Sequence, residues 1–236
     1  MPAGGQRRSS ESVDNYLKAI LALSGPEERR VTIKALSEEL HVAPASVTNM
    51  LQKLAGEASP KVEYERHRGV QLSHAGKRRA LEVVRHHRLI ETFLYEVLDY
   101  PIDEVHEEAE RLEHFISERF EERIAAKLGH PKIDPHGHSI PALDGRMAAR
   151  ESIVLAEVQG EGTFVVDSVS DRNASSLRRM EGRGVVPGAR LEVRTGTGAS
   201  SLRVRIGRGK AFELSREAAR EVRVARPPSD RGTRRG

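Results

Sequence analysis

Residues 31–57, VTIKALSEELHVAPASVTNMLQKLAGE, decide the fold of the first part of this chain. The first ten of them predict a short helix with Thr32 as N-cap, because its hydroxyl can accept a hydrogen bond from a free N–H of the first turn. After a turn at 41–42, residues 43–57 predict a second helix, since apolar residues recur every three or four positions. Two short helices joined by a tight turn are typical of a helix-turn-helix. The side chains expected to face the core from the second helix are Val47, Met50, Leu51 and Leu54.

The flanking segments extend this pair into a winged helix-turn-helix. ESVDNYLKAILAL (11–23) predicts a preceding helix, and VEYERHRGVQLS (62–73) predicts two strands around a turn at 67–69. In that fold the third helix enters the DNA major groove and the hairpin, or wing, lies along the backbone. A small helical domain with a polar surface is the alternative. The expected DNA-binding residues are Ser46, Thr48, Asn49, Gln52 and Lys53 on the third helix and Arg66 and Arg68 on the wing.

The rest of the chain has helical and strand-like parts, so the expected fold class is α+β. Residues 74–98 and 102–128 predict two longer helices, and the apolar stripe of the second could pair with its copy in a homodimer. Residues 129–150 are rich in Pro, Gly and His and predict a linker. Short strand-like runs between glycine-bearing turns predict a small β-barrel over 151–226.

Composition excludes several classes of protein. Of the 236 residues, 37% are hydrophobic, and no apolar run is long enough to span a bilayer. The start, MPAGGQRRSS, lacks the apolar region of a secretory signal and predicts a disordered tail. The absence of cysteine excludes disulfides, cysteine zinc sites and thiol nucleophiles, and a cytoplasmic location is expected. The net charge of +4 weakly favours a polyanionic partner.

Histidines and glutamates gather at helical spacing in the middle of the chain. In 74–98, His87 and Glu91 lie four residues apart among apolar residues, where a buried pair costs desolvation free energy unless something compensates. If a second helix with such side chains packed beside this one, the two helices could together supply six nitrogen and oxygen metal ligands. A structural hydrogen-bond network and a catalytic cluster are the alternatives, but HExxH, GxGxxG and GxSxG are absent, so no enzyme is expected. The stretch HEEAERLEH places four more such side chains on one helical stripe: His106, Glu110, Glu113 and His114.

Several segments, in order, resemble the diphtheria-toxin-repressor family (DtxR/MntR) of metal-dependent regulators. They are VDNYLKAI, VAPASVTNMLQKL, VEYERHRGVQLS, HHRLIETFL, VHEEAERLEHFIS and LGHPKIDPHGHSIP. The last part of the chain resembles the SH3-like, FeoA-type domain of the longer members. The resemblance implies a homodimer that binds double-stranded operator DNA when its metal sites fill. It divides the chain into a winged-helix domain (1–73), a helical metal-binding and dimerisation domain (74–141), a linker (142–150), an SH3-like domain (151–226) and a basic disordered tail (227–236).

The resemblance also implies two groups of metal ligands. The ancillary group matches His87, Glu91 and His106, and the primary group matches Glu110, Glu113 and His114. The first-helix ligand of the primary group falls on Asn15, with Asp14 beside it. Lys18 stands where the short manganese regulators carry a second carboxylate, which disfavours a closely spaced pair of manganese ions.

Further candidate ligands lie in two other segments. In the family the third domain can add a ligand to the ancillary group, and Asp171 and Asn173 are the candidates here. His136 and His138 match a family loop near that group. One alternative is that they are ligands in some state, but we expect them to be solvated linker histidines.

The nature of the ligands predicts the metal. Iron-responsive members carry a sulfur ligand where this chain has Glu110, and an all-oxygen-and-nitrogen set favours Mn(II), with Fe(II) as the alternative. Co, Ni, Zn or Cd can substitute in vitro. The expected function is a metal-responsive repressor of metal-uptake genes, with no membrane partner and no small organic substrate. The alternatives are a metal-handling enzyme and a metal-independent winged-helix regulator with a structural His/Glu network.

Overall fold

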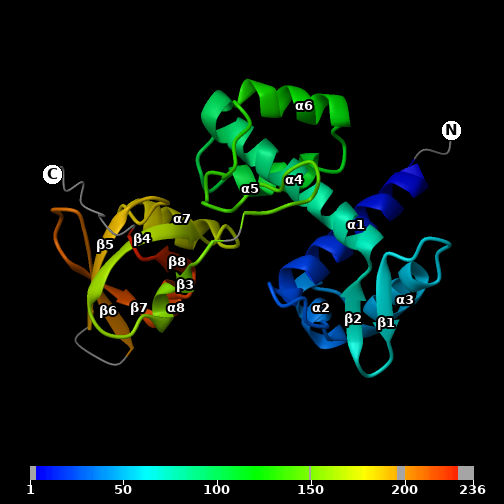
Figure 1. The fold of residues 1–236 in the computed structure, drawn as a ribbon, viewed down its shortest axis with the longest axis horizontal. Helices are drawn as coiled ribbons and strands as arrows, with labels where there is room; N and C mark the ends of the chain where they lie inside the picture. The colour runs from blue at the N-terminus through cyan, green and yellow to red at the C-terminus, as the bar shows by residue number, and fades with distance from the viewer. Residues whose placement is uncertain (1–3, 149, 196–199, 228–236) are drawn as a thin grey trace, which may run out of the picture. The chain divides into compact units, whose positions relative to one another are not determined.

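The computed structural model describes residues 4–148, 150–195 and 200–227, which form two units (Figure 1). The first unit consists of Met1–Ile90, Ala109–His130 and Ile140–Met147, and the second of Glu91–Glu108, Pro131–Ser139 and Ala148–Gly236. Helices α4 (His74–Leu98) and α5 (Val105–Leu112) contribute residues to both units. Most of the predicted C-terminal tail lies outside the described residues.

The first unit begins with the predicted winged helix, which is confirmed. Its elements are α1 (Gly4–Ser24), α2 (Ile33–Leu40), α3 (Pro44–Ala55), β1 (Val62–Glu65) and β2 (Gly69–Leu72). Thr32 caps α2 by accepting the N–H of Ala35, and α2 ends at His41, whose left-handed backbone turns the chain toward α3. The prediction of a disordered start is wrong from Gly4 onward, because α1 begins there. The core of the winged helix consists mainly of Leu17, Ile20, Val31, Leu36, Val47, Leu51, Leu54, Val62 and Val70.

The wing is held to the segment that precedes α2. Val31 and Val70 exchange two backbone hydrogen bonds of 2.8 and 2.9 Å. Gly69, with φ of 92°, allows this approach, because a Cβ there would lie 2.4 Å from the carbonyl oxygen of Val31. The hairpin therefore has a fixed position relative to the helix-turn-helix.

The predicted single helix over 102–128 is wrong. The chain forms α5, a turn, and then α6 (Glu118–Lys127), which begins where the Ser117 hydroxyl accepts the N–H of Phe120. This break divides the predicted apolar stripe. Leu112, Phe115 and Phe120 are 37%, 61% and 49% exposed, so they do not belong to the core of this unit.

The second unit contains an open six-stranded antiparallel sheet in the order β3-β8-β4-β5-β6-β7. Among the described residues no pairing joins β3 to β7, so a closed barrel is not confirmed. Two helices and β8 were not predicted, and the first strand is only two residues long because a 3-10 helix (Leu155–Glu157) follows it directly. The strands are β3 (Ile153–Val154), β4 (Gly162–Val169), β5 (Arg190–Thr195), β6 (Ser201–Ile206), β7 (Phe212–Ser215) and β8 (Val222–Ala225), and the helices are α7 (Ala174–Glu181) and α8 (Arg216–Ala219).

Part of the predicted linker is an ordered loop of the second unit. The Asp134 carboxylate accepts the N–H groups of His136 and His138 at 2.9 and 2.8 Å. Gly137, with φ of 92°, packs against β4, where a Cβ would lie 2.3 Å from the carbonyl oxygen of Asp167. His136 is 0% exposed, so the expectation that it is solvated is wrong. No helix among the described residues is long and apolar enough to cross a membrane.

Candidate metal centres and nucleic-acid interface

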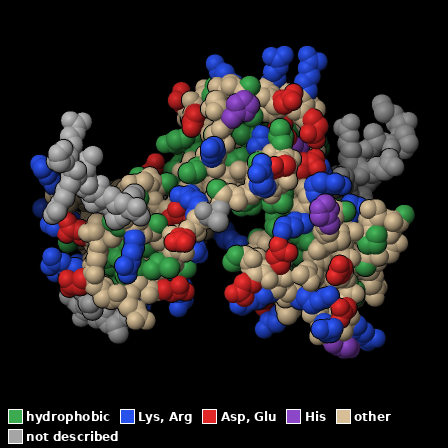
Figure 2. All heavy atoms as spheres, in the orientation of Figure 1, with side chains coloured by type: hydrophobic (Ala, Val, Ile, Leu, Met, Phe, Trp, Pro, Cys, Tyr) green, Lys and Arg blue, Asp and Glu red, His purple; other side chains and the backbone are tan. Residues whose placement is uncertain are grey.

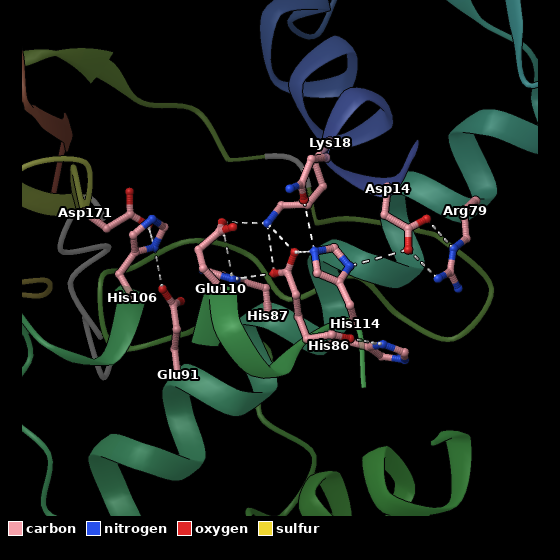
Figure 3. A network of polar contacts seen from close by, with 12 residues as sticks. Asp14, Lys18, Arg79, His86, His87, Glu91, His106, Glu110, His114 and Asp171 are labelled. Carbon is pink, nitrogen blue, oxygen red and sulfur yellow. Dashed lines mark hydrogen bonds and ion pairs between the residues drawn. The ribbon is translucent and has the colours of Figure 1, made fainter. Parts of the chain in front are cut away.

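A partly buried carboxylate cluster in the first unit surrounds the end of Lys18 (Figure 3). The Lys18 ammonium donates to Glu110 Oε1 at 2.7 Å and to both carboxylate oxygens of Glu113 at 2.7 and 2.8 Å. His87 Nδ1 lies 2.6 Å from Glu113 Oε2. Burial alone lowers the pKa of Lys18, but Glu113 and Glu110 outweigh it, so the pKa lies above its usual value. We call Lys18, His87, Glu110 and Glu113 the carboxylate cluster.

Two further side chains of α1, Asn15 and Asp14, make polar contacts in the same region. His114 Nε2 lies 3.0 Å from Asn15 Oδ1 and 3.3 Å from Glu113 Oε1. Asp14, which is 2% exposed, accepts two hydrogen bonds from Arg79, at 2.8 and 2.7 Å. Burial raises the pKa of Asp14, but His114 and Arg79 outweigh this and hold the pKa below its usual value. Of the two candidate first-helix ligands, Asn15 therefore faces His114 most closely, while Asp14 is engaged by Arg79.

A second ion network lies beside the carboxylate cluster, and sequence reasoning missed it. Glu121, 2% exposed, accepts from Arg85 Nε at 2.5 Å and lies 3.0 Å from His86 Nε2. Burial lowers the pKa of His86, but the hydrogen bond to Glu121 and its charge outweigh this and raise it. Burial raises the pKa of Glu121, but His86 and Arg85 outweigh this and lower it. Nothing in the spacing of these residues distinguishes them from the exposed charges on the same helices.

The second unit holds a histidine cluster, which we define as Glu91, His106, Asp171, His136 and His138. His106 Nδ1 lies 3.1 Å from Glu91 Oε1 and 3.5 Å from Asp171 Oδ2 (Figure 3). One ligand atom from each of Glu91, His106 and Asp171 lies within 4.8 Å of the other two. Asn173, the other third-domain candidate, instead caps α7 by accepting the N–H of Ser176.

The loop histidines complete this cluster. His136 Nδ1 lies 3.6 Å from Glu91 Oε2, and His138 Nδ1 lies 3.7 Å from Asp171 Oδ2. Burial lowers the pKa of His136, but Glu91 outweighs this and raises it to about 9. Burial raises the pKa of Asp171, but His138 and His106 outweigh this and lower it. These carboxylate and imidazole groups come from four segments, lie close together and are buried or half-buried, and they fit a divalent transition-metal ion.

The two clusters differ in how well they fit a metal. In the histidine cluster, imidazole nitrogens of His106, His136 and His138 face carboxylate oxygens of Glu91 and Asp171. In the carboxylate cluster the oxygens of Glu110 and Glu113 face an ammonium group, so the expected primary ligand set does not fit a metal as it stands.

The expected DNA-binding residues lie on exposed parts of the winged helix. Ser46, Asn49, Gln52 and Lys53 are exposed on α3, and Thr48 is half-buried, with its hydroxyl donating to the carbonyl of Pro44. Arg66 and Arg68 are exposed at the turn of the wing, where Arg68 also pairs with Glu65 at 2.7 Å. Lys and Arg side chains gather around the end of this hairpin (Figure 2).

The fold and these clusters define a class: a winged-helix protein that carries clusters of carboxylate and imidazole side chains in addition to its DNA-binding fold. Residues 9–70 match the N-terminal DNA binding domain of the iron dependent repressors, residues 73–142 match their metal binding and dimerisation domain, and residues 153–226 match the FeoA domain. The chain therefore belongs to the iron-dependent repressor family, which includes the diphtheria toxin repressor. This is a family of metal-dependent, DNA-binding transcriptional repressors, not of enzymes.

Individual relatives span nearly the whole chain. The iron-dependent repressor IdeR of Mycobacterium leprae is 31% identical over 229 residues, covering 91% of this chain and 96% of that protein. The solved structure of a manganese-dependent transcriptional repressor in complex with manganese has 36% identity and a TM-score of 0.82, covering 90% of this chain and 99% of that one. The structure of ScaR with bound Zn²⁺ has 29% identity and a TM-score of 0.76, covering 91% and 99%.

Proposed function

We propose that this chain is a manganese-responsive repressor that binds operator DNA as a homodimer in the cytoplasm and controls metal-uptake genes. The observation that carries the proposal is the histidine cluster, in which Glu91 is fully buried and faces His106 and His136. Its donors are oxygen and nitrogen, which favour Mn(II), and manganese-dependent repressors are among the similar solved structures. Fe(II) is the alternative, supported by the likeness to IdeR.

Glu91, His106 and Asp171 are the proposed ligands, with His136 and His138 beside them. When bound, a divalent ion supplies positive charge that offsets the two carboxylates. Glu91 comes from α4, His106 from α5, and Asp171 from the loop after β4. These side chains therefore hold three segments of the second unit together when their charges are offset. Metal and DNA binding then reinforce each other if both favour the same arrangement of the chain.

The proposed division of labour follows the predicted domains. Residues 1–73 bind DNA, 74–141 dimerise and hold metal, 142–150 connect, and 151–226 form the SH3-like domain that supplies Asp171. The exposure of Leu112, Phe115 and Phe120 supports a dimer contact, because large apolar side chains at a surface favour a protein partner that covers them.

The test is fluorescence anisotropy of the full-length protein with a labelled duplex taken from DNA upstream of its own reading frame, at fixed salt. Added MnCl₂ should tighten binding at least tenfold. The double variant Glu91→Gln/His106→Gln should bind the same duplex as weakly with MnCl₂ as without it. Equal affinity of the wild type with and without metal would refute the proposal.

A further inference from the structure

We propose that the Lys18 ammonium is the resident cation of the carboxylate cluster, so that the metal response of this chain is confined to the histidine cluster. The second clause rests on the proposed function, whereas the first rests only on the contacts of Lys18. The primary ligand set of the family would thus be occupied in this protein by one of its own side chains.

The hydrogen bonds of Lys18 match the number of its donors. An ammonium group has three N–H bonds, and here three carboxylate oxygens lie 2.7, 2.7 and 2.8 Å from Nζ. Charge-assisted bonds of this length are among the stronger ones in proteins. All three donors are therefore used within the cluster.

Burial and charge keep Lys18 in this position. Its side chain is 17% exposed and that of Glu113 is 0% exposed, so moving the ammonium away would leave a buried carboxylate without its main counter-charge. A divalent ion bound to the same oxygens would stand beside the ammonium, and like charges at such a separation repel. Metal and Lys18 thus compete for the same oxygens.

The position of Lys18 also gives it a structural role. It lies on α1, inside the matched DNA-binding domain, whereas Glu110 and Glu113 lie in the matched metal-binding domain. Asp14, paired with Arg79, and Asn15, beside His114, lie on the same stretch of α1. These contacts hold α1 through the charges and dipoles of the chain itself. A metal ion is therefore not needed to connect α1 to Glu110, Glu113 and His114.

The experiment is equilibrium dialysis of the full-length protein against MnCl₂, with bound manganese counted per subunit. We expect one ion for the wild type and two for Lys18→Gln, which removes the charge and leaves a shorter, neutral polar side chain. Lys18→Arg keeps the charge and should still bind one. Lys34→Gln, on α2 where the side chain is 84% exposed, is the control for loss of a lysine and should also bind one.

A second variant makes the test independent of how Lys18→Gln folds. In Glu91→Gln/His106→Gln the histidine cluster cannot bind metal, so the proposal predicts no bound manganese. One remaining ion in this variant, lost again on adding Glu113→Gln, would show that Lys18 swings away from the carboxylates and would overturn the proposal. So would a folded Lys18→Gln that binds no more manganese than the wild type. Failure of the proposed function is a separate result, because it appears as DNA binding that ignores metal whatever the stoichiometry.

Discussion

Replacing Glu121 by glutamine should destabilise the first unit by about 3 kcal/mol. The side chain is 2% exposed and is bonded to Arg85 at 2.5 Å and His86 at 3.0 Å. Removing one partner of a buried ion pair costs about 3–5 kcal/mol, because the other charge is left without compensation. Arg85 keeps its hydrogen bond to the carbonyl of Pro141, and a glutamine oxygen can still accept one bond, so the lower end applies.

The assay is urea and thermal unfolding of the full-length protein, with Glu122→Gln as control. Glu122 is the exposed neighbour on α6, so its substitution should change the free energy of unfolding by less than about 0.5 kcal/mol. For a chain of this size a loss of 3 kcal/mol lowers the Tm by about 6–12 °C. If Glu121→Gln lowered the free energy of unfolding no more than Glu122→Gln does, the conclusion that the buried Glu121 carboxylate is stabilised by Arg85 and His86 would be refuted.

The Glu121–His86 pair also predicts how the stability difference between the wild type and Glu121→Gln depends on pH. The pKa of Glu121 is lowered from 4.5, so its contribution is complete above that pH and is lost as pH falls through the folded value. The pKa of His86 is raised from 6.5, so its contribution is complete below that pH and is lost as pH rises through the folded value. The difference between wild type and Glu121→Gln should therefore be largest between about pH 4.5 and 6.5. A difference that grows steadily above pH 8 would contradict this.

Three further predictions concern other parts of the chain. Gly137→Ala should lower stability by about 2 kcal/mol or more and weaken manganese binding, because the added Cβ would meet the carbonyl of Asp167. Thermal melts and equilibrium dialysis measure the two effects. Gly160→Ala is the control: φ there is 78° but nothing lies within 4 Å of the added Cβ, so only the smaller cost of the backbone conformation is expected. Arg66→Ala should weaken binding to all duplexes alike and reduce the slope of log affinity against log salt by about 1 in anisotropy titrations, and a change in sequence preference would contradict a phosphate contact. Phe115→Ser should shift the protein toward monomer in sedimentation equilibrium, because this side chain is 61% exposed and available to a partner. When wild type and variant are compared at the same fraction of monomer, their Tm values should be equal. An unchanged dimer would argue against a role for Phe115 in the interface.

The winged helix could be predicted because its signals are local. A threonine before an apolar run caps α2, apolar spacing gives α3, and alternation around residues 67–69 gives the wing. The break between α5 and α6 was missed, because apolar residues continue at helical spacing across it while Ser117 starts a new helix. The sheet was predicted only as separate strands, because the pairing of β4 with β8 depends on contacts far apart in the chain.

The amino-acid sequence by itself determined the kind of side chain at each site, and the resemblance placed these side chains in two ligand groups. Only the tertiary structure decided which charges meet. Lys18 reaches Glu110 and Glu113, which are 92 and 95 residues away, and His136 is buried against Glu91 although its neighbours in sequence resemble a linker. Helical periodicity specifies the face on which a residue lies but not what is packed against that face. The carboxylates that look like metal ligands in the sequence therefore acquire a lysine as their partner only when α1 packs against them.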